Sequence, residues 1–239
     1  MTKKSSKSAV WGLSQTGSLK DRIVASIVDR IVNGSLPVGA RLPPEASLCS
    51  EMGVSRVALR EAVKQLEVLG FLRIARGNGT LVTQPDLSSA EPVIEFLGKT
   101  GKISFADLHA LRTLVEIEAV GLLAAVRTDS LCDALDKIVE DGVAHIRDSY
   151  GHVTLDYEFH QLLLDACPNP LLAMVLSPFS KYLRKSRELS FSSITKARRA
   201  FEAHADIAGA IRSRDSPRAR KLMSAHLSET AHDLKSITV

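Results

Sequence analysis

The sequence predicts a mainly α-helical protein in two parts: a small N-terminal module with one β-hairpin, followed by a longer all-helical module. Only 5% of the 239 residues are aromatic although 45% are hydrophobic. The core is therefore expected to consist of Leu, Val, Ile and Ala, which suit helices. Apolar residues recur at helical spacing along most of the chain. Two short apolar runs around the tip Arg76-Gly77-Asn78-Gly79 predict the hairpin.

Three helices are expected before the hairpin. The first begins at Ser18, which forms a capping box with Asp21, and it ends at Gly34. The turn-rich stretch SLPVGARLPPE leads to a short helix that ends at Gly53. Ser55 caps the third helix, SRVALREAVKQLEVLG. The apolar stripe of this helix that is expected to face the core consists of Leu59, Ala62, Val63, Leu66 and Leu69.

The chain after the hairpin lacks strand signals and is expected to form consecutive helices. Their predicted starts are Ser104, Asp129, Thr154, Asn169-Pro170, Thr195 and Ser216-Pro217, with a shorter helix over residues 92–100. The expected organisation is a disordered basic tail at 1–17, a module of three helices and a hairpin at 18–84, a linker at 85–92 and a helical module at 93–239.

Composition favours a cytoplasmic protein. The three cysteines are far apart and form no CxxC pair, which indicates a reducing compartment. The N-terminus lacks an apolar run of signal-peptide length, and no segment approaches 18 uninterrupted apolar residues. We therefore expect no membrane partner.

The N-terminal module has the composition of a DNA-binding protein. Three helices and a hairpin in about 65 residues form a winged helix-turn-helix. Residues 1–85 carry a net charge of +6, whereas residues 86–239 carry −2. Arg56, Arg60 and Lys64 are spaced four apart on one face of the third helix, and Arg76 lies at the hairpin tip. The alternative for these cations is an ordinary solvated surface.

The residues of this module resemble a known family. The stretch RLPPEASLCSEMGVSRVALREAVKQLEVLGFLRIARGNGTLV is similar to the GntR family of bacterial winged-helix transcription regulators, and the resemblance covers residues 18–83. The positions that match the family's DNA contacts are Arg56, Val57, Ala58, Arg60, Arg76 and Gly77. One position departs from the family pattern, because Ala46 follows Glu45 where relatives usually carry Arg or Lys. The resemblance implies a transcription regulator that lacks this one basic contact.

The helical module resembles the FCD effector domain of the FadR-like branch of that family, over residues 92–235. The stretches that carry the resemblance are LHALRTLVEIEAVGLLAA, LDYEFHQLLLDACPNPLL, EAHADIAGAIRSRD and AHL. In that family an Asp and three histidines commonly bind a divalent metal that helps to hold a small carboxylate. The matching positions are Asp156, His160, His204 and His226.

The residue pattern supports this metal set. Asp156 and His160 are four residues apart on one helix face, next to Phe159. His204 and His226 also occur in apolar surroundings, where an imidazole without a partner is costly. One shared ion (Zn, Ni, Mn, Co or Fe) would satisfy all four side chains. The alternative is a hydrogen-bonded polar cluster without metal. The other histidines, His109, His145, His152 and His232, are expected on the surface.

Arg112 is the candidate effector-binding residue. It lies on an apolar helix one turn before Glu116, so it either pairs with that residue or holds a carboxylate ligand in a bidentate manner. The resemblance favours the second role. The predicted function is a ligand-responsive regulator that binds a two-fold symmetric DNA operator as a homodimer and responds to a small organic acid. The alternative is a metal-dependent enzyme acting on a small organic acid, with an appended DNA-binding domain.

Overall fold

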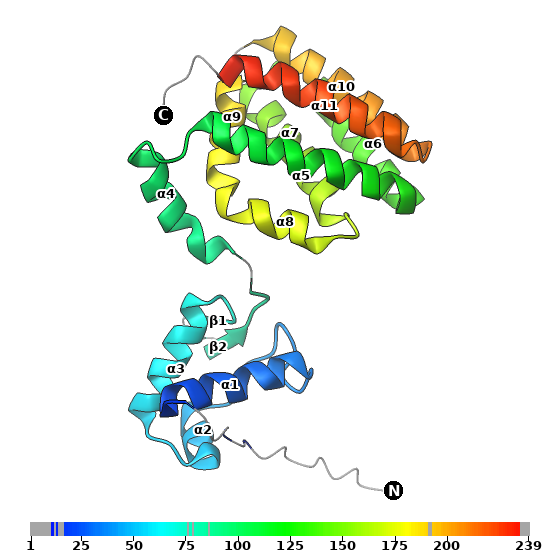
Figure 1. Cartoon of the computed structure of the whole chain (residues 1–239). Coiled ribbons are helices and arrows are strands. Elements are labelled where there is room, and N and C mark those ends of the chain that lie inside the picture. Colours follow the sequence, from blue (N-terminus) through cyan, green and yellow to red (C-terminus); the bar gives the residue numbers. More distant parts are fainter. Residues whose placement is uncertain are drawn as a thin grey trace, which may run out of the picture. The chain divides into compact units, whose positions relative to one another are not determined.

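The chain folds into two compact units, residues 1–89 and 90–239. The structure, a computed structural model, describes residues 11, 13, 17–75, 77, 79–85, 87–190 and 193–234. The first unit contains three helices and a hairpin, and the second contains helices alone among its described residues (Figure 1). The mainly α fold class with a short hairpin is therefore confirmed.

The first unit is a winged helix-turn-helix. Its elements are α1 (Leu19–Val32), α2 (Glu45–Met52), α3 (Arg56–Val68), β1 (Leu72–Ala75) and β2 (Gly79–Val82). The capping box expected at Ser18 and Asp21 is present, and Ser55 caps α3. The two strands pair antiparallel, with Leu72 opposite Val82. Ile23, Ile27, Leu48, Leu59, Leu66 and Leu72 are among the buried side chains of its core.

One expectation for this unit needs correction. Leu69 was expected in the buried stripe of α3, but it is the C-terminal cap residue and is 45% exposed, because the helix ends at Val68 and the chain turns away. The tail at residues 1–17 lies largely outside the described residues. Its Trp11 is described and is buried against the core, with the guanidinium carbon of Arg30 3.9 Å from the ring centroid.

The second unit is a bundle of helices joined by short turns. Its elements are the 3-10 turn η2 (Ser177–Phe179) and the helices α4 (Glu91–Lys99), α5 (Phe105–Val126), α6 (Asp129–Ala144), α7 (Ser149–Asp165), α8 (Pro170–Leu176), α9 (Ser180–Ser190), α10 (Ile194–Arg212) and α11 (Ser216–Leu234). A 3-10 turn, η1 (Ser88–Ala90), precedes α4 within the segment expected as a linker. The main core lies between α5, α6, α7, α10 and α11.

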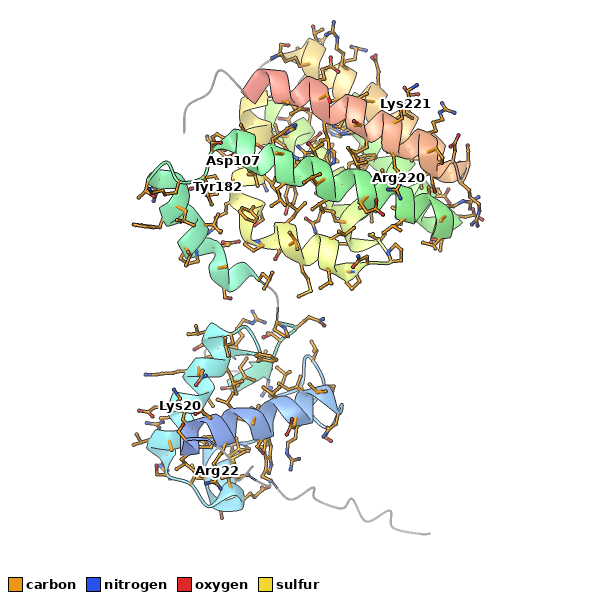
Figure 2. All side chains as sticks on the ribbon, in the orientation of Figure 1. Lys20, Arg22, Asp107, Tyr182, Arg220 and Lys221 are labelled. Carbon is orange, nitrogen blue, oxygen red and sulfur yellow. The ribbon has the colours of Figure 1, made fainter. Side chains whose placement is uncertain are left out.

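Helices α5 and α11 lie side by side and run antiparallel (Figure 1). At one end the hydroxyl of Ser216 donates to the carbonyl of Gly121, and near the other end a ring nitrogen of His109 lies 2.7 Å from the carbonyl oxygen of Leu227. Arg220 of α11, which is labelled in Figure 2, pairs with Glu118 of α5. This pairing brings the start of α5 next to the end of α11.

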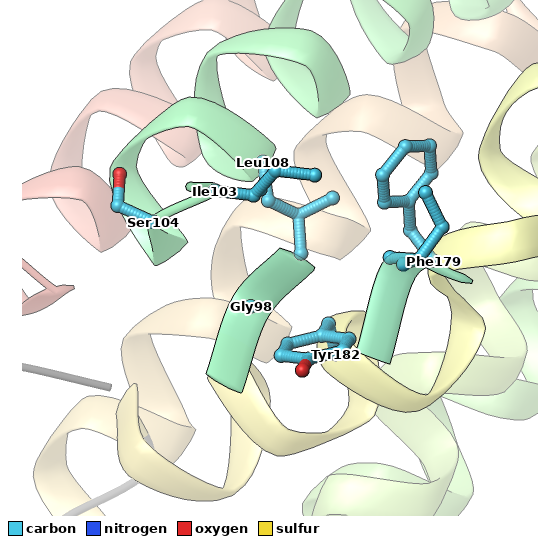
Figure 3. A pocket seen from close by; sticks show the side chains of 7 residues that line it. Gly98, Ile103, Ser104, Leu108, Phe179 and Tyr182 are labelled. Atoms are coloured by element: carbon cyan, nitrogen blue, oxygen red, sulfur yellow. The ribbon is translucent and has the colours of Figure 1, made fainter. Parts of the chain in front are cut away.

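Helix α4 packs against the start of α9. The hydroxyl of Tyr182 donates to the carbonyl of Glu95 at 3.1 Å, and Tyr182 passes so close to Gly98 that a larger residue would collide with it. Figure 3 shows Gly98 and Tyr182 at a small pocket that is also lined by Ile103, Leu108 and Phe179. The glycine therefore sets the approach of these two helices.

The starts of two helices were not anticipated. Helix α7 begins at Ser149, five residues before the expected Thr154, and α9 follows η2 as a separate helix that was not expected. Ser104 with Asp107, Thr128 before α6, and Asn169 act as caps at or next to the expected positions. The α10 start also lies within one residue of the expected Thr195, with Ser193 as its cap. Among the residues that the structure describes, no helix has the length and apolar character needed to span a bilayer.

Candidate metal centre and nucleic-acid interface

The outer face of α3 presents cations to solvent. Arg56, Arg60 and Lys64 are exposed, and Val57 is 69% exposed. The opposite face carries Leu59, Ala62 and Leu66, which are buried in the core. Ala58 is half-buried and packs against that core, so it offers less surface than its neighbours.

Arg60 pairs with an acidic residue of α2. Its Nε atom donates to Oε2 of Glu45 at 3.1 Å, and Oε1 lies 2.9 Å away without accepting a hydrogen bond. Arg60 and Lys64 line a groove between α2, α3 and the hairpin. Of the two expected wing residues, Gly77 is exposed with a φ of 77°, and Arg76 lies outside the described residues.

Four metal-competent side chains from three helices meet in the second unit. The Asp156 carboxylate and the His160 ring come from α7, the His204 ring from α10 and the His226 ring from α11. One ligand atom of each lies within 4.8 Å of all the others, and all four residues are buried. The sequence spacing explains the first pair, whereas the two other rings arrive through helix packing.

The four ligand atoms form a closed ring of donors, in which each atom lies within 3.7 Å of two others. Oδ1 of Asp156 lies 3.3 Å from Nε2 of His204 and 3.7 Å from Nε2 of His160. Nε2 of His226 lies 3.3 Å from Nε2 of His204 and 3.3 Å from Nε2 of His160. Ligands bound to one ion at about 2.0–2.2 Å lie roughly 3–4 Å apart. The four atoms therefore have the spacing of a coordination sphere.

Glu116 of α5 faces the outer nitrogen of one of these rings. Its Oε2 atom lies 2.7 Å from Nδ1 of His160, although the angle is poor for a hydrogen bond. A carboxylate on the far nitrogen of a ligating histidine fixes the ring orientation and raises the basicity of the ligating nitrogen. Nε2 of His160 is left to face the other donors. Glu116 therefore contacts a ligand residue from outside and is not itself one of the four ligands.

Two buried arginines complete the surroundings. Nε of Arg112 donates to Oε1 of Glu116 at 2.7 Å, which is the intrahelical pair that the sequence left open. Nε of Arg187, on α9, donates to Oδ2 of Asp156 at 2.7 Å. This second contact leaves the other carboxylate oxygen, Oδ1, directed at the histidines.

The protonation states suit metal ligands. Burial lowers the pKa of His204 and of His226 to about 3, and the positive charge of Arg112 adds to the effect on both rings. Burial also places the pKa of His160 well below its usual value. Burial disfavours the charged carboxylate of Asp156, but the pKa of this carboxyl group is lowered all the same, and the positive charges of Arg187 and Arg112 contribute to that lowering. The rings are thus neutral and the carboxylate ionised, as metal binding requires.

Aromatic packing keeps the His204 ring in place. The ring stacks on Phe159 with 4.1 Å between centroids, and Phe201 lies nearly perpendicular to it with 5.4 Å between centroids. Three imidazole nitrogens with one carboxylate oxygen form a donor set that suits divalent Zn, Ni, Co, Fe or Mn. The residues present therefore fit a transition-metal ion.

Sequence reasoning missed part of this site. Arg187 lies in KYLRKSRELS, where four cations occur within eight residues and nothing distinguishes the buried one. His109 and His152 were expected on the surface but are 8% and 3% exposed, because α5 and α7 pack against neighbouring helices on those faces. His145 is exposed as expected, and the side chain of His232 lies outside the described residues.

Two family models match this chain, one in each unit. The model described as "Bacterial regulatory proteins, gntR family" matches residues 19–82, and the FCD domain model matches residues 107–229. The chain is 30% identical over 203 residues to the HTH-type transcriptional regulator LutR of Bacillus subtilis (strain 168), across 82% of this chain and 92% of that protein. It is 29% identical over 171 residues to the Glc operon transcriptional activator of Escherichia coli (strain K12), across 69% and 67%. The solved structure of Streptococcus agalactiae GntR superimposes with a TM-score of 0.74 at 26% identity, over 89% of this chain and 99% of that one.

Proposed function

We propose that this protein senses a small organic acid through a metal ion. The chain belongs to the gntR family of bacterial regulatory proteins and carries an FCD domain, so it is a transcriptional regulator. In this proposal the protein binds a two-fold symmetric DNA operator as a homodimer, and the acid changes its affinity for that operator. The family assignment argues against the enzyme alternative, since the matched models and relatives are regulators.

The observation that carries the sensing proposal is the closed ring of donors from Asp156, His160, His204 and His226. When bound, a divalent ion supplies open coordination positions that attract a carboxylate. The four side chains hold the ion, and they tie α7, α10 and α11 together as they do so. The carboxylate of Glu116 lies next to the outer nitrogen of His160, and Arg187 orients the carboxylate of Asp156.

The proposed DNA interface is the outer face of α3 together with the wing, which comprises the hairpin and its tip. Arg56 and Arg60 project from the first turns of α3, where a recognition helix meets base edges, and Lys64 follows one turn later. Val57 offers an apolar contact such as that to a thymine methyl group. Ala58, Arg76 and Gly77 remain proposed contacts by resemblance.

Arg60 pairs with Glu45 at the surface, where such ion pairs are weak and easily exchanged. The arginine is still 66% exposed and therefore available to DNA. One winged helix makes few base contacts, and two half-sites multiply specificity, which is why a dimer on a symmetric operator is proposed. Sedimentation at micromolar concentration tests the dimer directly, and a monomer both free and on DNA contradicts it.

The experiment that tests the function selects bound sequences from random duplex DNA, with the metal-loaded protein. We expect an inverted repeat, bound with an affinity that falls steeply with salt concentration. Selected DNA is then titrated with protein in the presence of a panel of small organic acids. At least one acid is expected to change the DNA affinity of the wild-type protein and not that of His204→Ala.

The matched control is His145→Ala, which removes an exposed histidine of the same unit. This variant should respond to the acid as the wild type does. Selection that yields no common sequence contradicts the DNA-binding role. An acid response that His204→Ala retains in full contradicts the metal-assisted site, and the four residues are then a polar cluster without a ligand.

A further inference from the structure

Two buried arginines face the carboxylate of Glu116, next to the four proposed metal ligands. Nε of Arg112 lies 2.7 Å from Oε1 of Glu116, and Nη2 of Arg187 lies 3.9 Å from the same oxygen. Arg112 is 2% exposed and Arg187 is 3% exposed. Each guanidinium group uses its Nε atom to hold a carboxylate of the protein. They come from α5 and α9, so helix packing brings the two positive charges together.

Each guanidinium group also keeps one terminal nitrogen without a protein partner. Nη2 of Arg112 and Nη1 of Arg187 are both buried, and neither has a hydrogen-bond acceptor among the described residues. A buried N–H group without an acceptor is costly, and the cost is larger when the group is charged. The two nitrogens are therefore available to an acceptor that the protein itself does not provide.

The charges around the four proposed metal ligands indicate that this acceptor should be negatively charged. The two buried arginines are balanced by two carboxylates, those of Glu116 and Asp156, and histidines bind a metal ion as neutral rings. A divalent ion adds two positive charges to this balanced set. Charges that are buried without compensation are strongly unfavourable. The site with its ion therefore lacks two negative charges.

We propose, building on the metal-assisted acid site above, that the effector is a small dicarboxylate and that Arg187 is a specificity-determining residue for its second carboxylate. One carboxylate group neutralises charge at the ion. The other accepts from the free Nη2 of Arg112 and the free Nη1 of Arg187, in the charge-assisted manner that guanidinium groups favour. A monocarboxylate of the same length compensates only one charge and leaves at least one of these donors without a partner.

The test compares acids that match in length and differ in charge. Protein loaded with one equivalent of Zn²⁺ is titrated calorimetrically at neutral pH with malonate and propionate, succinate and butyrate, and glutarate and pentanoate. Hydrogen bonds to charged groups correspond to affinity factors of about ten or more. We expect the best dicarboxylate to bind at least tenfold more tightly than its matched monocarboxylate.

Substitution of Arg187 tests whether this side chain sets the preference for a dicarboxylate over a monocarboxylate. In Arg187→Gln the ratio of dicarboxylate to monocarboxylate affinity should fall to within about threefold, because one donor and one charge are lost. The ratio is compared only between proteins that carry one Zn²⁺, so that any change in metal affinity cancels. Lys185→Gln is the matched control, since Lys185 lies on the same helix but is exposed, and its ratio should equal that of the wild type.

The outcomes separate this inference from the function on which it rests. If a monocarboxylate binds the Zn²⁺-loaded protein as tightly as its matched dicarboxylate, or if no dicarboxylate binds, the inference is wrong while the metal site stands. A ratio that Arg187→Gln leaves unchanged also overturns the role of Arg187. If the protein binds no Zn²⁺ at all, the proposed sensing function fails together with the inference.

Discussion

Acidification should destabilise the metal-free second unit and leave the first unit largely unaffected. His204 and His226 are neutral in the folded protein, with pKa values of about 3, whereas in the unfolded chain they protonate near pH 6.5. Between these values the unfolded state binds more protons than the folded state. The contribution of these two neutral histidines to the stability of the folded second unit is thus fully present above pH 6.5 and is lost as the pH falls below that value.

The magnitude follows from the two pKa values. At pH 5.5 an unfolded histidine is about 90% protonated, which stabilises the unfolded chain by about 1.4 kcal/mol relative to pH 8. His204 and His226 together therefore cost about 3 kcal/mol. The lowered pKa values of His160 and His109 act in the same direction.

The chain offers separate probes for its two units. Trp11, the single tryptophan, packs in the first unit, and all three tyrosines lie in residues 90–239. Urea unfolding in the presence of a chelator, followed by tryptophan and tyrosine fluorescence and by circular dichroism, gives the free energy of each transition. No histidine precedes His109, so the first unit is an internal control.

A free energy of unfolding for the second unit that stays constant between pH 8 and pH 5.5 would refute the neutral burial of these histidines. An equal loss in both units would show that acid acts on the protein through something other than the histidines. Saturating metal should restore stability in proportion to its binding, since it stabilises only the folded state.

Three further predictions concern other parts of the molecule. Arg60→Ala should cost about 1–3 kcal/mol at a single base pair of the selected operator; a fluorescence anisotropy titration that shows a uniform loss on all sequences would make it a phosphate contact. Gly98→Ala drives a methyl group into Tyr182 and should destabilise the packing of α4 on α9 by about 1–3 kcal/mol in chemical denaturation, and an unchanged midpoint contradicts the close approach. Phe159→Ala removes a fully buried ring that stacks on His204 and should cost about 3–5 kcal/mol in the same assay, so a loss below 1 kcal/mol argues against that packing.

Much of the fold was predictable because its signals are local. Ser18 with Asp21 and Ser104 with Asp107 form capping boxes within four residues of sequence, and the structure has both. The hairpin follows from a glycine-rich tip, since Gly77 and Gly79 both adopt positive φ. Such features depend on the chain's own backbone and do not require tertiary contacts.

The candidate site was predictable only in part. Asp156 and His160 share a helix face, which their spacing predicts, while His204 and His226 were assigned by resemblance and by their apolar surroundings. Arg187 could not be distinguished, because its burial depends on how α9 packs against α7 and α5. Non-local packing of this kind leaves no periodic signal in a single basic segment.

The metal content of the purified protein is the most direct test of whether Asp156, His160, His204 and His226 bind a metal ion. Protein prepared without chelator is examined by native mass spectrometry and then titrated with Zn²⁺, Ni²⁺ and Mn²⁺, in parallel with His204→Ala and His145→Ala. We expect one ion per chain in the wild type and in His145→Ala, and a much weaker affinity in His204→Ala. If the wild-type protein takes up no stoichiometric metal, or if His204→Ala binds it as tightly as the wild type, the four side chains do not form a metal site.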